Sequence, residues 1–352
     1  MPSSQPIRKV VFTGAGDVSN ISVIDSTISP PAAGEVQVRP LYSGFSGSDI
    51  NMRRGLYPMQ KKAPFTPGYC LAGTVVSLGP KCTSSLTPGQ LVACLTVYDS
   101  QAQLVNLPEK YLVPVPASPT GKFLVDPRSA TAVMLDWTTA QGLVESANVR
   151  AGQRVFVHGM SGAVGWAVFM LSLKRGATVY GTASASKHDL IRAHGGHPFV
   201  YTDKSWMTAM KDLGGAHVVF DALGFESFDE SYDILHRGSC GPLPSLSRDA
   251  TGLTSGGLLS MAAAPRSQLP GVLRLLARNA KVWDSRATSF YYISRDDKTF
   301  VPTVEKLFGM IAKGEIEIPI RQVWDMEEIR SAHSAWGKGD GVGSMLIKIN
   351  DE

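Results

Sequence analysis

An apolar strand, a glycine-rich turn and an apolar helix follow one another near the middle of this 352-residue chain, and this order constrains the fold more than any other feature. The strand is predicted over residues 154–158 (RVFVH), and the helix opens from the glycines of segment 159–165 (GMSGAVG). Strands and helices continue to alternate after it, which predicts a doubly wound parallel sheet of the α/β class. The further strands are expected over residues 178–181, 199–201, 217–220, 258–261 and 280–283.

The stretch before about residue 125 has a different texture. Its short apolar segments are separated by proline and glycine turns, which favours a largely antiparallel, barrel-like unit. Its strands are expected over residues 9–13, 35–42, 72–78 and 90–95. Later in the chain we expect helices over residues 130–147 and 301–313 and a strand-forming tail over residues 342–349. Residues 238–257 are rich in Gly, Ser and Pro, and we expect them to form an exposed loop.

The glycine turn has the chemistry of a dinucleotide site. Glycines allow a tight turn and close approach of the backbone to a pyrophosphate, while the amino end of the helix offers free N–H groups and a positive dipole end. The spacing G-x-x-G-x-x-G departs from the commoner G-x-G-x-x-G, and the alternative is a turn whose glycines serve packing only. The cofactor contacts expected here are Gly159, Ser161, Gly162, Ala163, Val164 and Gly165.

The end of the second strand indicates which dinucleotide binds. NAD sites place an Asp or Glu there to accept a hydrogen bond from the ribose 2′-hydroxyl. This sequence has no acid until Asp189, whereas Ser184 and Ser186 can donate to a 2′-phosphate and Lys187 can neutralise its charge. We therefore expect NADPH as the cofactor. A solvated lysine in the first turn of a helix is the alternative for Lys187.

Charge and composition exclude several classes of protein. Thirty-four Lys plus Arg against thirty Asp plus Glu give a net charge of +4, with the basic residues scattered singly or in pairs, so nucleic acid is not expected as a partner. No apolar run approaches the roughly 18 residues of a membrane span, so no membrane association is expected. The four cysteines form no C-x-x-C pair and no secretory signal is visible, so we expect a reducing, cytoplasmic location.

Several blocks in a fixed order resemble the medium-chain dehydrogenase/reductase superfamily, in its zinc-independent quinone oxidoreductase and enoyl reductase branch. They are residues 43–58 (SGFSGSDINMRRGLYP), 67–73 (PGYCLAG), the glycine turn, 220–224 (FDALG) and 341–347 (GVGSMLI). The resemblance covers essentially the whole chain. It implies a GroES-like catalytic domain over residues 1–125, completed by residues 297–352, and a Rossmann NADP-binding domain over residues 126–296.

The resemblance also implies that this chain holds no metal. Zinc-dependent members of the superfamily use a Cys in G-x-C-G-S-D and a His in G-H-E. Here Ser46 stands at the position of that Cys, and Tyr69-Cys70 stand at the positions of His-Glu. A serine, a tyrosine and one cysteine do not provide the thiolate, imidazole and carboxylate ligands that zinc requires. For Cys70 we expect the role of a small buried hydrophobic residue.

Hydride transfer without a metal suits an electron-poor alkene conjugated to a carbonyl, such as an enone, a quinone or an enoyl thioester. In similar enoyl thioester reductases the tyrosine before the proline is the usual proton-donor candidate, which implies that role for Tyr57. A loop tyrosine packed on the rim of the site is the alternative. The secondary catalytic candidates, as polar groups near the substrate, are Ser46, Asn51 and Tyr69.

Four further residues complete the expectations. By resemblance, Tyr201 and Gly224 contact the cofactor. His158 is expected to be a packed, hydrogen-bonded imidazole, and Asp49 a buried carboxylate paired with an arginine. The expected partner is a small or carrier-tethered unsaturated carbonyl substrate. A homodimer and a polyketide synthase partner are compatible with the sequence, and the alternative function is a non-catalytic NADP-binding scaffold or regulator.

Overall fold

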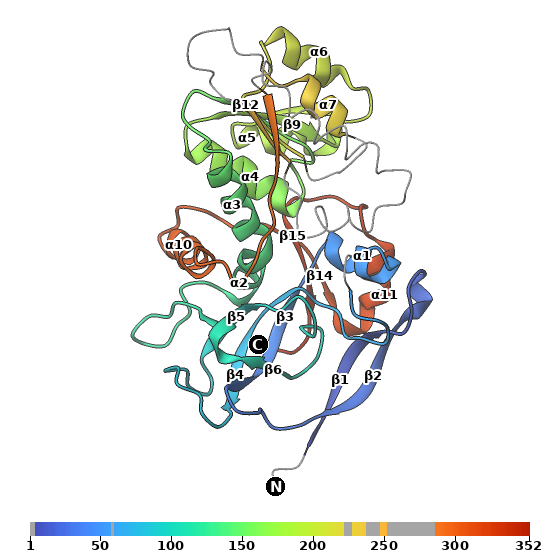
Figure 1. Ribbon diagram of the computed structural model, residues 1–352, viewed down its shortest axis with the longest axis vertical. Helices are drawn as coiled ribbons and strands as arrows, with labels where there is room; N and C mark the ends of the chain where they lie inside the picture. Colours follow the sequence, from blue (N-terminus) through green and yellow to red (C-terminus); the bar gives the residue numbers. More distant parts are fainter. Residues whose placement is uncertain (1–3, 58–59, 222–226, 237–246, 252–285) are drawn as a thin grey trace. The chain divides into compact units, whose positions relative to one another are not determined.

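The computed structural model describes residues 4–57, 60–221, 227–236, 247–251 and 286–352 (Figure 1). The chain divides into two compact units. Unit 1 comprises Met1–Thr138, Ser294–Gly339 and Ser344–Glu352, and unit 2 comprises Thr139–Ile293 and Asp340–Gly343. Residues 340–343 therefore cluster with unit 2, although the residues on both sides of them belong to unit 1.

Unit 1 is built on a seven-stranded sheet of order β14-β15-β3-β4-β5-β7, with β6 paired to β3 and a separate β1–β2 hairpin. All of its strand pairs are antiparallel except β14 with β15, which confirms the antiparallel expectation for the amino-terminal part. Alternating side chains such as Val36, Val38 and Val92 are buried in its core. The strands are β1 (Gln5–Phe12), β2 (Ile21–Ile28), β3 (Glu35–Phe45), β4 (Cys70–Leu78), β5 (Leu91–Leu95), β6 (Val105–Pro108), β7 (Val113–Pro114), β14 (Ile320–Asp325) and β15 (Ser344–Lys348).

The helix expected over residues 130–147 forms as three consecutive segments, α2, a π-helical segment and α3. A π segment inserts an extra residue into a helix and often accompanies a functional site. The helices of unit 1 are α1 (Gly47–Arg54), α2 (Pro127–Ala132), η3 (Val133–Trp137), α10 (Phe300–Ala312) and α11 (Ile329–Ser334). Helix α3 (Thr138–Ser146) belongs to unit 2 from its second residue onward. Single turns of 3₁₀ helix occur at η1 (Val18–Asn20), η2 (Glu109–Tyr111) and η6 (Met326–Glu328).

Unit 2 contains a six-stranded sheet of order β10-β9-β8-β11-β12-β13, and every pair in it is parallel. This confirms the doubly wound parallel sheet. The strands are β8 (Arg154–Val157), β9 (Thr178–Ala183), β10 (His197–Val200), β11 (Val218–Phe220), β12 (Ser247–Thr251) and β13 (Arg286–Phe290). The helices are α4 (Ala163–Lys174), η4 (Ala185–Lys187), α5 (His188–Ala193), α6 (Ser205–Asp212) and α7 (Phe228–Asp233).

The expectation of an exposed loop over residues 238–257 is wrong for its middle part. Residues 247–251 form β12, which pairs in parallel with β11 and β13. The segment SRDAT carries no apolar pattern that would predict a strand, and it is recognised as one by its backbone pairing. The rest of that stretch, and the strands expected over 258–261 and 280–283, lie outside the described residues.

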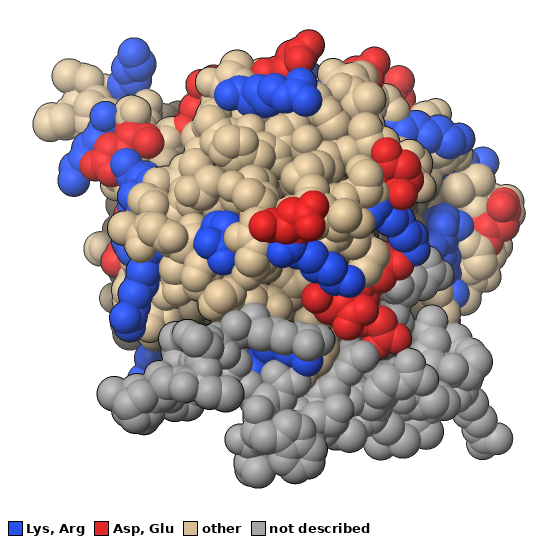
Figure 2. Space-filling model, turned by 90° about the horizontal axis from the view of Figure 1, so that it is seen from above, with Lys and Arg blue, Asp and Glu red and all other residues tan. Residues whose placement is uncertain are grey.

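Two further properties concern membrane-spanning helices and the distribution of surface charge. Among the described residues, no helix is both long and apolar enough to cross a membrane. On the face shown in Figure 2, lysine and arginine side chains are interspersed with aspartate and glutamate side chains. Such mixing is typical of a solvated surface.

Candidate functional site

The glycine turn between β8 and α4 depends on the absence of side chains. Gly159 has φ +67°, a left-handed conformation that glycine adopts without strain. A Cβ atom on Gly165 would lie 2.1 Å from the carbonyl oxygen of Gly159, so the turn closes only because residue 165 has none. Two bonds tie the turn to β9, from Gly159 N to Thr182 Oγ1 (3.1 Å) and from Met160 N to the Thr182 carbonyl (2.9 Å).

The first turn of α4 offers backbone donors. The N-cap residue is Gly162, whose lack of a side chain leaves no capping acceptor for the N–H groups of the first turn. Those groups belong to Ala163, Val164 and Gly165, three of the predicted cofactor contacts. A helix of 12 residues adds the positive end of its dipole. Such an arrangement can accept the phosphates of a dinucleotide.

The β9 edge, which we define as Ser184, Ser186, Lys187 and Asp340, lies just after the second strand of the sheet. Ser184 and Ser186 are exposed, and Lys187 is 6% exposed. Asp189, the first acid after the strand, pairs with Arg192 at 3.1 Å. Serine hydroxyls are therefore placed where a ribose 2′ substituent is recognised in such folds.

Sequence reasoning missed the fourth member of this edge. Ser186 Oγ donates to Asp340 Oδ1 at 3.4 Å, across 154 positions of sequence. The backbone N–H of Gly343 donates to the Ser161 carbonyl at 3.1 Å, which brings segment 340–343 alongside the glycine turn. The only signal in the sequence was the glycine-rich setting of the acid, in residues 337–344 (GKGDGVGS).

Other predicted residues of unit 2 are placed as follows. Tyr201 is 56% exposed just after β10. Gly224 lies outside the described residues. His158 is 4% exposed and its Nε2 lies 3.0 Å from Ser231 Oγ, which in turn donates to Asp221 Oδ2 at 2.7 Å. Burial lowers the pKa of His158, so a packed neutral imidazole, as predicted, ties β8 and β11 to α7.

Two tyrosines meet inside unit 1. The Tyr57 hydroxyl donates to the Tyr69 hydroxyl at 2.9 Å, and the rings cross edge to face with centroids 6.1 Å apart. Tyr57 is 6% exposed and Tyr69 1% exposed. The structure thus brings together the proton-donor candidate and one secondary candidate, which lie 12 positions apart in sequence.

Ser46 and Asp49 form the capping box that begins α1. Ser46 Oγ accepts from the Ser48 N–H at 3.2 Å and donates to Asp49 Oδ2 at 3.3 Å, and the Ser46 N–H donates to the same carboxyl oxygen at 3.0 Å. The hydroxyl of Ser46 is therefore already used by the helix. Asn51, half-buried, lies within the same helix.

Asp49 is buried, as predicted, but its expected arginine partner is wrong. In the described part of the chain its carboxyl is held by Ser46 and by Gln101, whose Nε2 donates to Oδ1 at 3.4 Å. Arg53, on the same helix, donates instead to His333 Nδ1 at 3.3 Å and to the Gly16 carbonyl. Burial raises the pKa of Asp49 to about 7.

Comparison with known proteins gives the family. Two family models match, the alcohol dehydrogenase GroES-like domain over residues 32–117 and the zinc-binding dehydrogenase over residues 195–347. The synaptic vesicle membrane protein VAT-1 homolog of Rattus norvegicus is 28% identical over 350 residues, covering 97% of this chain and 84% of that protein. A probable quinone oxidoreductase of Schizosaccharomyces pombe is 26% identical over 347 residues, covering 97% of each chain. A solved mycobacterial structure, complexed with NADPH, has a TM-score of 0.79 at 21% identity, covering 97% of this chain and 99% of that chain.

The chain belongs to the medium-chain dehydrogenase/reductase superfamily, in its quinone oxidoreductase branch. Unit 1 carries the GroES-like domain of these oxidoreductases, and unit 2 has their NAD(P)-binding fold. The backbone donors of α4 and the Cβ-free turn fit a dinucleotide, because they provide both the space and the donors for its phosphates. The residues that would hold it are those of the turn and of the β9 edge.

Zinc, which other members of the superfamily bind, does not fit the residues at the corresponding positions. Ser46 and Tyr69 are engaged in the contacts described above. The Cys70 thiol donates to the Thr131 carbonyl at 3.5 Å, and burial raises its pKa well above the usual range, which disfavours the thiolate that zinc binds. Within the described ranges, no group of three or more His, Cys, Asp or Glu side chains is arranged to hold a metal ion.

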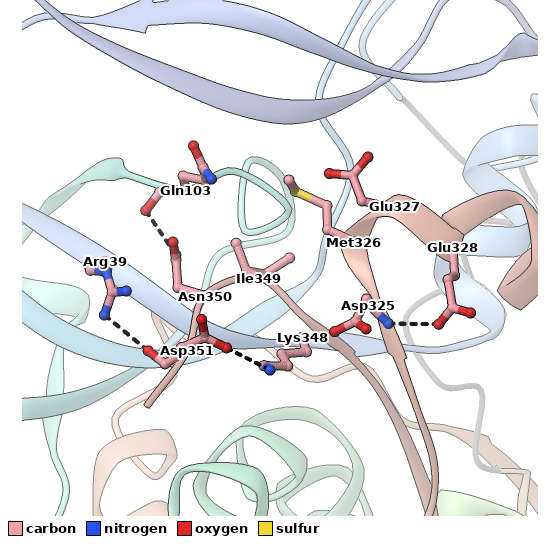
Figure 3. Close-up of a pocket in the computed structure, with 10 residues that line it drawn as sticks. All are labelled: Arg39, Gln103, Asp325, Met326, Glu327, Glu328, Lys348, Ile349, Asn350 and Asp351. Carbon is pink, nitrogen blue, oxygen red and sulfur yellow. Dashed lines mark hydrogen bonds and ion pairs between the residues drawn. The ribbon is translucent and has the colours of Figure 1, made fainter.

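A cavity of about 480 Å³ lies in unit 1 and is shown in Figure 3. Several of its polar groups bond to one another. Lys348 Nζ pairs with Asp351 Oδ1 at 2.7 Å, and Arg39 Nη1 donates to the Asp351 carbonyl at 3.1 Å. Asn350 Nδ2 donates to the Gln103 carbonyl at 3.1 Å. Because its polar groups hold the carboxyl-terminal segment in place, we assign this cavity no part in the reaction.

Proposed function

We propose that this chain is an NADPH-dependent reductase of an activated carbon–carbon double bond. The substrate class is a free enone or quinone, or an unsaturated acyl chain tethered through a thioester to coenzyme A or to a carrier. A polyketide synthase is one source of such a tethered chain. The observation that carries the proposal is the tyrosine pair, because Tyr69 stands where zinc-dependent relatives have a histidine ligand and its hydroxyl bonds to Tyr57.

When bound, the reduced nicotinamide supplies a hydride to the β-carbon of the substrate. The chain's own residues then have to supply one proton to the α-carbon. A phenol is protonated at neutral pH and can donate it, and we assign this role to Tyr57. Loss of that proton leaves a phenolate 2.9 Å from the Tyr69 hydroxyl. Tyr69 can then donate to it, and a hydrogen bond to a charged oxygen is stronger than one to a neutral oxygen. Solvent restores the proton afterwards.

The remaining catalytic candidates have supporting places in this proposal. Asn51 can donate an amide hydrogen to the carbonyl oxygen on which negative charge develops. Ser46 acts through the fold of α1, since its hydroxyl caps that helix. On the cofactor side, Ser184, Ser186 and Lys187 recognise the 2′-phosphate, and Tyr201 and Gly224 contribute contacts to the nucleotide.

The test uses purified protein, NADPH and a panel of enones, quinones and enoyl thioesters. We expect substrate-dependent oxidation of NADPH, and Tyr57→Phe should lower kcat by about 10²-fold, the scale of general-acid effects, with the Kd for NADPH unchanged. Tyr69→Phe should have a smaller effect of the same kind. Tyr111→Phe is the matched control, because its hydroxyl bonds to exposed Asp296 instead. A kcat for Tyr57→Phe equal to that of the wild type would reject Tyr57 as the donor.

A second candidate function is favoured by the similarity to the VAT-1 homolog. In that case the chain binds NADP as a scaffold or regulator and turns nothing over. Tight NADPH binding without oxidation across the whole panel would favour this function over the reductase.

A further inference from the structure

The β9 edge contains the carboxylate of Asp340, which comes from neither β9 nor the helix α5 that follows it. No acid follows β9 in sequence until Asp189, yet the fold brings Asp340 next to Ser186 from 154 positions away. Asp340 is exposed and its Oδ1 accepts from Ser186 Oγ at 3.4 Å. Segment 340–343 is fixed there by the bond from Gly343 to the Ser161 carbonyl, so the carboxylate belongs to the same compact unit as the glycine turn.

A small cavity of about 240 Å³ opens at this edge. Its walls combine one cation, one hydroxyl and one carboxylate with apolar groups. The lining residues are Ser186, Lys187, Leu190, Asp340, Gly341 and Val342. Two of its polar residues, Ser186 and Asp340, are exposed, whereas the Lys187 residue is 6% exposed. A group entering this cavity therefore meets the carboxylate as readily as it meets the hydroxyl.

The two nicotinamide dinucleotides differ only in what they present to such an edge. A ribose 2′-hydroxyl can donate a hydrogen bond, and a carboxylate accepts it. A 2′-phosphate carries between one and two negative charges at neutral pH and accepts only, so the same carboxylate repels it and competes with it for Ser186. Lys187 and the serines favour the phosphate, while Asp340 favours the hydroxyl.

We propose that Asp340 is a specificity-determining residue that limits the preference of this chain for NADPH over NADH. The inference rests on the proposed NADPH site at the β9 edge. Asp340 supplies in space the acid that is missing in sequence, so both dinucleotides bind and the wild-type preference is small. Asp340→Asn removes the charge and keeps the size of the side chain. The preference of the serines and Lys187 for a 2′-phosphate is then no longer opposed.

The experiment measures Kd by fluorescence titration for NADPH and NADH, and for adenosine 2′,5′-bisphosphate and adenosine 5′-monophosphate, which differ only in the 2′-phosphate. In Asp340→Asn, we expect the preference for the phosphorylated member of each pair to rise about 10-fold, a free energy of about 1.4 kcal/mol. The effect should shrink at high ionic strength, because the edge is exposed. Asp189→Asn is the matched control, since it removes a nearby exposed carboxylate that already pairs with Arg192.

The outcomes separate this inference from the proposed function. A preference in Asp340→Asn within twofold of the wild-type value, or an equal rise in Asp189→Asn, would overturn the role of Asp340. Failure of the NADPH proposal gives a different result, namely that Lys187→Ala and Ser186→Ala leave the binding of adenosine 2′,5′-bisphosphate unchanged. A wild type with a small preference for NADPH, together with an Asp340→Asn variant whose preference is about 10-fold larger, supports the inference.

Discussion

Two buried carboxylates of unit 1 contrast with the β9 edge of unit 2, whose polar groups are mostly exposed. In unit 1, Asp49 is fully buried against Ser46 and Gln101, and Asp136 accepts from Ser344 Oγ at 2.6 Å. Burial raises the pKa of Asp49 to about 7 and that of Asp136 to about 6. In unit 2, Ser184, Ser186 and Asp340 face solvent. Asp49 and Asp136 thus hold the fold of unit 1, whereas the serines and the carboxylate of the β9 edge remain accessible to a ligand.

The largest effect that we expect is on NADPH binding, from a substitution in the glycine turn of unit 2. Gly165→Ala places a Cβ atom 2.1 Å from the Gly159 carbonyl oxygen, so the turn must move. A shift of about 1 Å in a binding element can cost about 10²-fold, and we expect at least that increase in the Kd for NADPH. Fluorescence titration measures it.

Gly309→Ala in α10 is the control for this substitution, because no described residue outside the neighbouring turns of its own helix lies within 4 Å of its Cβ position. That variant should leave the Kd unchanged and gain up to about 1 kcal/mol of unfolding free energy. An unaltered Kd in Gly165→Ala would show that the turn does not hold the cofactor.

The next effect is the pH dependence of unit 1. Because burial raises the folded-state pKa of Asp49 from 3.8 to about 7, the folded chain keeps this proton to a higher pH than the unfolded chain does. The stability from the buried neutral carboxyl is full below about pH 4 and is lost as the pH rises toward 7. Asp49→Asn stays neutral. Between about pH 5 and pH 7.5, the wild type should lose roughly 2–3 kcal/mol of unfolding free energy more than the variant.

Urea unfolding at the two pH values measures this difference. Asp189→Asn is the matched control, because it makes the same substitution at an exposed carboxyl instead of a buried one. Parallel pH profiles for wild type and Asp49→Asn would mean that Asp49 is ionised throughout, and the contrast between the two units would then fail.

The smallest effect compares two serines. Ser46→Ala removes the cap of α1 and should cost about 1 kcal/mol of unfolding free energy while leaving the Kd for NADPH unchanged. Ser186→Ala should change stability by less than about 0.5 kcal/mol and weaken NADPH binding. Thermal unfolding and fluorescence titration on both variants give the four values. Weaker NADPH binding in Ser46→Ala together with a loss of stability in Ser186→Ala would contradict this contrast.

Most of the fold could be predicted because its signals are local. Strands β3, β4 and β5 carry apolar runs between turns, and β8 with the glycine turn identified the parallel sheet. Strand β12 could not be predicted, since SRDAT has no apolar pattern and depends on its neighbours for pairing. The α1 helix begins at a capping box, S-x-x-D, which is also a local signal in the sequence.

The candidate site divides in the same way. The turn residues and Ser184, Ser186 and Lys187 follow from a local motif and its distance along the chain. The Tyr57–Tyr69 bond and the approach of Asp340 to Ser186 depend on tertiary packing. Asp49 shows the limit of inference from residue type, because burial was expected correctly but its partners are hydroxyl, backbone and amide groups.

The carboxyl-terminal segment completes both units. Residues 340–343 join unit 2 beside the glycine turn, and β15 directly after them is inserted between β14 and β3 in the sheet of unit 1. During synthesis on the ribosome, unit 2 cannot acquire all of its contacts until residue 343 has been translated, and unit 1 cannot do so until residue 348 has been translated. Folding of the nucleotide-binding part and of the GroES-like part should therefore finish late, and within a few residues of one another along the chain.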